Sequence, residues 1–127
     1  MTKILLIDDE PFFARMTAAM LAPADVSVAR NGAEGLRMIQ GQSFDLVVTD
    51  LLMPEKDGIE TILELRKRNA TLPVLAISGG GTIGHRGDLL RMAQELGATA
   101  TLSKPFTREE LIAAVSLCLE EAKRRAG

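Results

Sequence analysis

The sequence contains no tryptophan, no tyrosine, one cysteine and one histidine. A single cysteine excludes a disulfide within the chain, and the apolar neighbours of Cys118, which are spaced as in a helix, predict a buried packing residue. The only histidine, His85, lies in a polar and glycine-rich stretch, which favours an exposed residue without a catalytic role.

The chain also lacks a long apolar segment and a strong charge of either sign. The short apolar run after Lys3 reaches Asp8 too soon for a signal peptide or a membrane span. Fifteen basic residues against 17 acidic ones leave a net charge of -2, which points to neither a nucleic-acid nor a membrane partner. We therefore expect a cytoplasmic protein with one domain, residues 1–127, and no room for a second, effector domain.

Apolar runs alternate along the chain with apolar residues at helical spacing. Continuous runs predict buried central strands at residues 4–7, 46–48 and 74–77, and alternating patterns predict edge strands at 26–28 and 98–102. Three- and four-residue spacing predicts helices at residues 11–21, 33–40, 59–68, 88–96 and 107–123. This alternation predicts a doubly wound α/β domain, and the edge patterns favour a five-stranded parallel sheet of flavodoxin-like (βα)5 order, 2-1-3-4-5.

Polar side chains follow four of the five predicted strands. Asp8 and Asp9 follow the first strand, Asp50 the third, Ser78 the fourth and Lys104 the fifth. Because parallel strands end at one edge of their sheet, we expect these side chains to meet at one rim. Three carboxylates there would repel one another unless a cation neutralised them, and Mg²⁺ binds one or two carboxylates together with phosphate oxygens. Asp50 is then a candidate nucleophile towards phosphorus, and Ser78 and Lys104 are candidate ligands of the phosphoryl oxygens.

The same residues carry a resemblance that covers essentially the whole chain. The chain resembles the CheY-like receiver domains of bacterial two-component response regulators in five segments: Asp8-Asp9-Glu10, Asp50-Leu51-Leu52-Met53-Pro54, Gly58, Ser78 and Lys104-Pro105-Phe106. The resemblance implies a stand-alone phosphoprotein of signal transduction. In this family a sensor histidine kinase or a histidine phosphotransfer protein would pass a phosphoryl group to Asp50, and a downstream protein would read the change.

The resemblance also implies roles for single residues. Asp9, Asp50 and the backbone carbonyl of Leu52 would bind Mg²⁺ directly, while Asp8 would act mainly through a bound water. The protein would not be an enzyme in the usual sense, because it would catalyse only its own phosphoryl transfer and dephosphorylation. It would work as a monomer or as a phosphorylation-dependent dimer, and its Lys104–Pro105 bond is a candidate for the cis isomer.

Thr101 departs from the family pattern, because it stands where receivers usually carry an aromatic residue that reports phosphorylation. Our hypothesis is that the signal travels instead through the glycine-rich loop at residues 79–87, which we expect to be mobile until Ser78 binds the phosphoryl group. Leu52 and Gly80, which occupy the positions that modulate water access, have no side chain that could orient water, so we expect a long-lived phosphorylated state. Of Phe12 and Phe13, at least one should pack inward.

Three other interpretations compete with this one. Residues 79–84 fit the dinucleotide pattern G-x-G-x-x-G, but they follow the fourth strand, and no acidic residue ends the next strand. The second alternative is a receiver fold that acts as an interaction module without phosphorylation. The third is a small phosphatase of the haloacid-dehalogenase kind with an aspartate nucleophile, although that family expects a second aspartate where this chain has Leu52.

Overall fold

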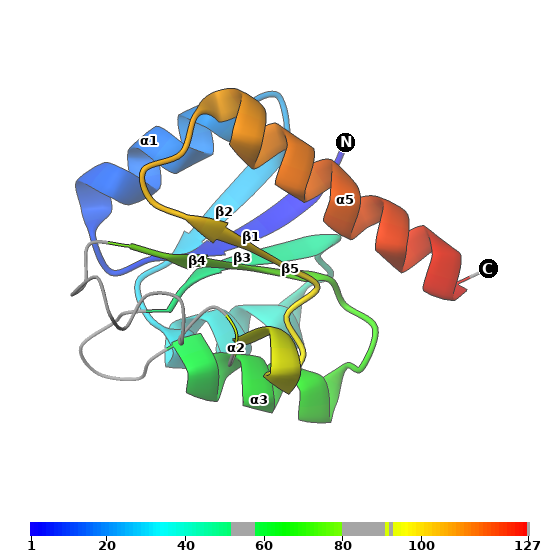
Figure 1. Ribbon diagram of the computed structural model, residues 1–127. Helices are drawn as coiled ribbons and strands as arrows, with labels where there is room; N and C mark the ends of the chain where they lie inside the picture. Colours follow the sequence, from blue (N-terminus) through cyan, green and yellow to red (C-terminus); the bar gives the residue numbers. More distant parts are fainter. Residues whose placement is uncertain (52–57, 80–90, 92, 127) are drawn as a thin grey trace.

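The computed structural model describes residues 1–126 except 52–57, 80–90 and 92, and it shows strands alternating with helices (Figure 1). The strands are β1 (Lys3–Ile7), β2 (Asp25–Ala29), β3 (Leu46–Asp50), β4 (Val74–Ser78) and β5 (Ala100–Ser103). Four helices lie wholly within the described residues: α1 (Pro11–Leu21), α2 (Gly32–Gly41), α3 (Gly58–Arg68) and α5 (Arg108–Ala126). The helix predicted at residues 88–96 lies partly outside the described residues, and residues 91 and 93–96 of it are helical.

All strands pair in parallel, in the order β2-β1-β3-β4-β5. Helices α1 and α5 cover one face of the sheet, and α2 and α3 cover the other (Figure 1). The predicted doubly wound fold and its strand order are therefore confirmed. Strands β1 and β3 are neighbours at the centre, so the residues that follow them lie side by side.

Side chains of the sheet separate into two apolar layers, because successive residues of a strand point to opposite faces. In β1, Leu5 and Ile7 pack in the cluster that includes residues of α2 and α3, whereas Ile4 and Leu6 pack with residues of α1 and α5. Cys118 is fully buried in the second cluster, as predicted, and burial raises the pKa of its thiol to about 11. None of the described helices is long and apolar enough to span a bilayer.

Helix ends in the described structure carry the side-chain caps that their residue types favour. The Asn31 side chain accepts a hydrogen bond from the Glu34 N–H at 2.8 Å at the start of α2. At the start of α5, Thr107 and Glu110 each accept a hydrogen bond from the other's backbone N–H, at 3.1 and 2.9 Å, which is a capping box. Gly97 follows the helical residues 93–96 with a φ of 124°, a conformation that strongly favours glycine.

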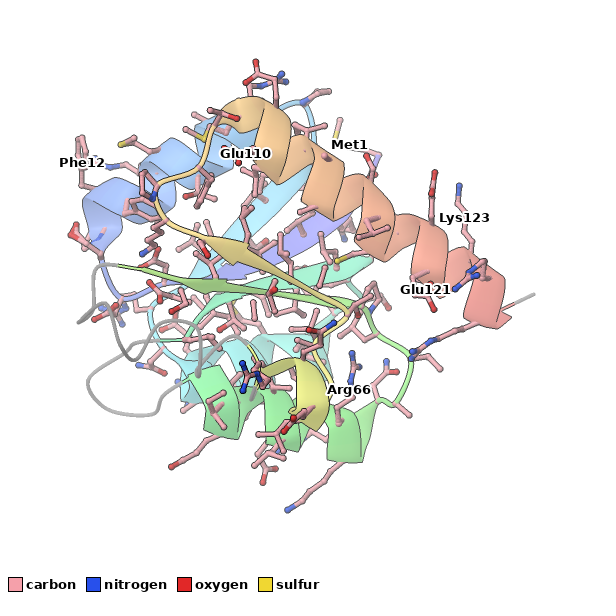
Figure 2. All side chains as sticks on the ribbon, in the orientation of Figure 1. Met1, Phe12, Arg66, Glu110, Glu121 and Lys123 are labelled. Carbon is pink, nitrogen blue, oxygen red and sulfur yellow. The ribbon has the colours of Figure 1, made fainter. Side chains whose placement is uncertain are left out.

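Arg66, in the last turn of α3, joins this helix to the segments before β4 and β5. Its guanidinium donates to the carbonyl oxygens of Leu72 at 2.6 Å, Gly97 at 2.8 Å and Asn69 at 3.2 Å. In Figure 2 its side chain points from α3 towards the chain that leads into β5. A single cation therefore satisfies three carbonyl groups in the connections on this side of the sheet.

We predict that Arg66→Met destabilises the protein by about 2–3 kcal/mol, because it leaves partly buried carbonyl groups without a charged donor. Urea unfolding monitored by circular dichroism measures this loss. The neighbouring Lys67→Met is the matched control, because the Lys67 side chain is 75% exposed and its replacement should change the free energy of unfolding by less than about 0.5 kcal/mol. Equal effects of the two substitutions would show that the carbonyl contacts add no stability.

Candidate functional site

Three carboxylates meet at the carboxyl ends of β1 and β3. Asp8 is 3% exposed and Asp50 is 6% exposed, while Asp9 is open to solvent. One carboxylate oxygen from each of the three residues lies within 4.8 Å of the other two. The cluster forms because β1 and β3 are adjacent and parallel, which brings the predicted acidic pair and the third aspartate together.

Burial and the neighbouring negative charges raise the pKa of Asp8 above its ordinary value. Loss of solvent around the carboxyl group is the largest cause, and the charges of Asp50 and Asp9 act in the same direction. The Glu10 N–H, which donates to Asp8 Oδ1 at 2.9 Å, and the charge of Lys104 lower the pKa in part. The local balance therefore disfavours the ionised form of Asp8 and leaves a place for a further positive charge.

Lys104 supplies the positive charge from the end of β5. Its Nζ lies 2.8 Å from Asp50 Oδ2, and its side chain is 21% exposed. The Lys104 N–H donates to the Ser78 carbonyl oxygen at 2.8 Å, which ties the ends of β4 and β5 together. The Lys104–Pro105 bond is cis, as expected. The lysine therefore closes the rim opposite the acidic pair.

Ser78, the last residue of β4, is fully buried. Its Oγ has no hydrogen-bond partner among the residues that the structure describes, a condition shared there only with Thr17 of α1. A buried hydroxyl without a partner costs about 1–3 kcal/mol, so its retention at a polar rim is consistent with a ligand that would complete its hydrogen bonding.

Gly58 brings the start of α3 against the acidic cluster. Its N–H donates to the Leu51 carbonyl oxygen at 3.1 Å. A Cβ atom at this position would overlap the carbonyl oxygen of Asp50 and the Cα of Leu51, both of which are backbone atoms that cannot turn away. Only glycine therefore allows α3 to begin this close to the proposed nucleophile.

The donor set of the acidic cluster fits a hard divalent cation. Carboxylate oxygens are the ligands that Mg²⁺ prefers, and the three carboxylates each bring one oxygen to within 4.8 Å of the other two. Burial is the largest cause of the raised pKa of Asp8, and the charges of Asp50 and Asp9 add to it, so a cation at this place would favour the ionised form. Asp8, Asp9 and Asp50 are accordingly the residues that would hold the ion.

The structure brings together Asp8, Asp9, Asp50 and Lys104, and it places Ser78 at the end of the strand next to Lys104. The predictions for Leu52, Gly80, His85 and the rest of the loop after Gly79 fall outside the described residues. Thr101 lies half-buried in β5 with Ala76 as its partner across the strand pair. The hypothesis that the phosphorylation signal travels through the loop at residues 79–87, and not through residue 101, stays a prediction.

Phe13 also lies at this rim. The sequence predicted only that at least one of Phe12 and Phe13 would pack inward. The Phe13 ring centroid lies 4.0 Å from Lys104 Nζ, within the range of a cation–π contact. Phe12, by contrast, is 63% exposed and points outward from the start of α1 (Figure 2). One sequence feature could have indicated that Phe13 lies near Lys104: it belongs to the first turn of the helix that follows the acidic pair, at the same rim as the lysine.

Comparison with known proteins identifies relatives over nearly the full chain. The family profile described as the response regulator receiver domain matches residues 4–116. The chain is 36% identical to the transcriptional regulatory protein CpxR homolog of Haemophilus influenzae over 125 residues, 96% of this chain and 52% of that protein. It is 37% identical to the transcriptional regulatory protein CiaR of Streptococcus pneumoniae over 112 residues, 87% of this chain and 48% of that protein. The chain thus spans about half the length of these relatives.

A solved structure resembles the whole fold. The receiver domain protein of Clostridium thermocellum is 30% identical, with a TM-score of 0.88, and the match covers 97% of this chain and 98% of that one. The similarity therefore includes the strand ends that carry the acidic cluster and the lysine.

We predict that Asp8→Asn stabilises the metal-free protein at pH 7, because asparagine can still accept the Glu10 hydrogen bond but adds no charge to the cluster. The raised pKa of Asp8 means that its ionised form opposes folding at neutral pH, and that this penalty fades as the pH falls through the folded-state pKa. The midpoint of thermal unfolding should rise by a few degrees, about what 1 kcal/mol produces in a domain of this size.

The difference in midpoint between Asp8→Asn and wild type should shrink as the pH is lowered and when Mg²⁺ is added to both proteins. Differential scanning calorimetry in the presence of a chelator, and then with Mg²⁺, measures both effects. An Asp8→Asn variant that is less stable than wild type without metal would contradict the conclusion that the charge of Asp8 opposes folding.

Proposed function

The chain belongs to the family of response regulator receiver domains, and from this we propose that it accepts a phosphoryl group on Asp50 from the phosphohistidine of a sensor histidine kinase or a histidine phosphotransfer protein. The observation that carries the proposal is the nearly buried Asp50 between two carboxylates and the ammonium group of Lys104. A downstream protein would then read a change of surface.

The transfer needs little covalent chemistry from the protein, which mainly positions groups and balances charge. A carboxylate oxygen of Asp50 attacks phosphorus, the phosphorus–nitrogen bond of the phosphohistidine breaks, and its electron pair stays on the imidazole nitrogen, which takes up a proton. Lys104 moves from the carboxylate to a phosphoryl oxygen, and the Ser78 hydroxyl donates to another. Mg²⁺, when bound by Asp8, Asp9 and Asp50, supplies positive charge for the phosphoryl oxygens.

The surface beside the cluster supports a protein as the phosphodonor. Phe12 and Met16 are exposed apolar side chains of α1, the helix that begins just after the acidic pair. A hollow lined in part by Asp9, Arg15 and Arg30 lies between the start of α1 and the end of β2. The phosphodonor would pack on α1 and present its histidine at the rim that carries Asp50.

The protein would not be an enzyme acting on other substrates, because the phosphoryl group ends on its own side chain. Its chemistry would be confined to this transfer and to the later hydrolysis of the acyl phosphate. The partners would be the phosphodonor and a protein target, with the receiver as a monomer or a phosphorylation-dependent dimer.

We predict that acetyl phosphate with Mg²⁺ adds one phosphoryl group to the wild-type protein and none to Asp50→Asn. Asparagine keeps the shape of aspartate but is no nucleophile towards phosphorus, so labelling should fall below detection. Intact-protein mass spectrometry measures the added mass, and Asp45→Asn is the matched control because Asp45 precedes β3 at its opposite end.

A chelator should remove labelling of the wild type. Labelling of Asp50→Asn at the wild-type rate would place the acceptor elsewhere. A wild-type protein that is not labelled would favour the alternative of a receiver fold that binds partners without phosphorylation. Sustained hydrolysis of phosphate esters would favour the alternative of a small phosphatase.

We predict that Ser78→Ala separates stability from function. The substitution removes a hydroxyl that has no partner in the described structure, so the free energy of unfolding should stay within about 1 kcal/mol of wild type or increase. Phosphorylation by acetyl phosphate should slow by about tenfold or more, because one donor to the phosphoryl oxygens is lost. Urea unfolding and the labelling time course measure the two quantities, and a destabilised variant with unchanged labelling would contradict both assignments.

A further inference from the structure

Lys104 lies between two groups that attract a cation. Its Nζ is 2.8 Å from Asp50 Oδ2 and 4.0 Å from the centroid of the Phe13 ring. The face of an aromatic ring is negative, so it attracts an ammonium group that is partly removed from water. The ring and the carboxylate therefore act on the same ammonium group.

A lysine at this position needs support, because its four-carbon stem has several rotatable bonds and loses conformational entropy when it is held. Gly79 supports the stem: a Cβ atom there would overlap the Cβ and Cγ atoms of Lys104, so the backbone of Gly79 lies directly against them. The Phe13 ring supports the ammonium end of the same side chain.

The Phe13 ring is itself held in place. Phe106 packs edge-on against it, with ring centroids 5.9 Å apart and an interplanar angle of 85°. This arrangement of two rings is favourable, and it ties the first turn of α1 to the segment that follows β5. Phe13 is thus a fixed surface and not a mobile side chain that happens to touch the lysine.

We infer that Phe13 is a positioning residue for Lys104: its ring holds the ammonium group where it meets Asp50 and, after transfer, the phosphoryl oxygens. The inference rests on the proposed function and adds a residue of α1 to the phosphoryl site. Without the ring the ammonium group samples more positions, so a smaller fraction of molecules presents it to the charge that develops during transfer.

The first test compares the rate constants of Asp50 phosphorylation by acetyl phosphate with Mg²⁺. Phe13→Leu should lower the rate about three- to tenfold, the range expected for loss of a partly buried cation–π contact. Phe13→Tyr, which keeps the ring face, should restore most of the rate. Phe44→Leu is the matched control, because Phe44 packs against the apolar cluster on the α2 and α3 face of the sheet, and it should leave the rate unchanged.

A double-mutant cycle separates positioning from packing. If Phe13 acts through Lys104, Phe13→Leu should have no further effect on the rate in a Lys104→Ala background. An equal decrease in both backgrounds, or a Phe13→Leu rate equal to wild type, would overturn the inference. A wild-type protein that is not labelled at all would instead refute the proposed function.

Nuclear magnetic resonance tests the contact in the folded wild type without any substitution. The ε-methylene protons of Lys104 should resonate upfield of their usual position because they lie over the ring face. This shift should persist in Phe13→Tyr and disappear in Phe13→Leu, or in Phe13→Met if the leucine variant does not fold. Unshifted wild-type protons would overturn the inference.

Discussion

Repulsion among carboxylates at one end of the sheet is the constraint on which the arrangement of this protein depends. The helices on both faces leave the strand ends as the edge where Asp8 and Asp50 sit, and both are almost removed from water. The pKa of Asp8 is raised because burial at this edge disfavours its ionised form. Lys104 supplies positive charge to this cluster from within the chain, and a bound Mg²⁺ would supply more.

Close backbone approaches keep these charges at their short distances. Gly58 lets α3 begin against the backbone of Asp50, and Gly79 lets the chain leave β4 against the stem of Lys104. The Phe13 ring lies against the ammonium group, and Phe106 packs edge-on against that ring. The site therefore depends on small residues as much as on the charged ones.

The sequence predicts most of the fold because each strand and each helix carries a local pattern. Apolar runs located the central strands, and the shared direction of parallel strands predicted that Asp8, Asp50 and Lys104 would meet. The contacts of Arg66 and Phe13 could not be predicted, because they depend on where a side chain points in three dimensions. A basic residue in the last turn of a helix and an apolar residue in its first turn both have ordinary explanations in a sequence. The missing partner of Ser78 likewise appears only once neighbouring atoms have positions.

The proposed nucleophile and its counter-charge come from opposite halves of the chain, since 54 positions separate Asp50 from Lys104. Between them the chain must complete α3, β4 and β5 before the ammonium group can reach the carboxylate. During synthesis the aspartate therefore leaves the ribosome well before its lysine, and a half-synthesised chain carries only the acidic side of the cluster. Signalling competence arrives late in translation, with the strand at the far edge of the sheet.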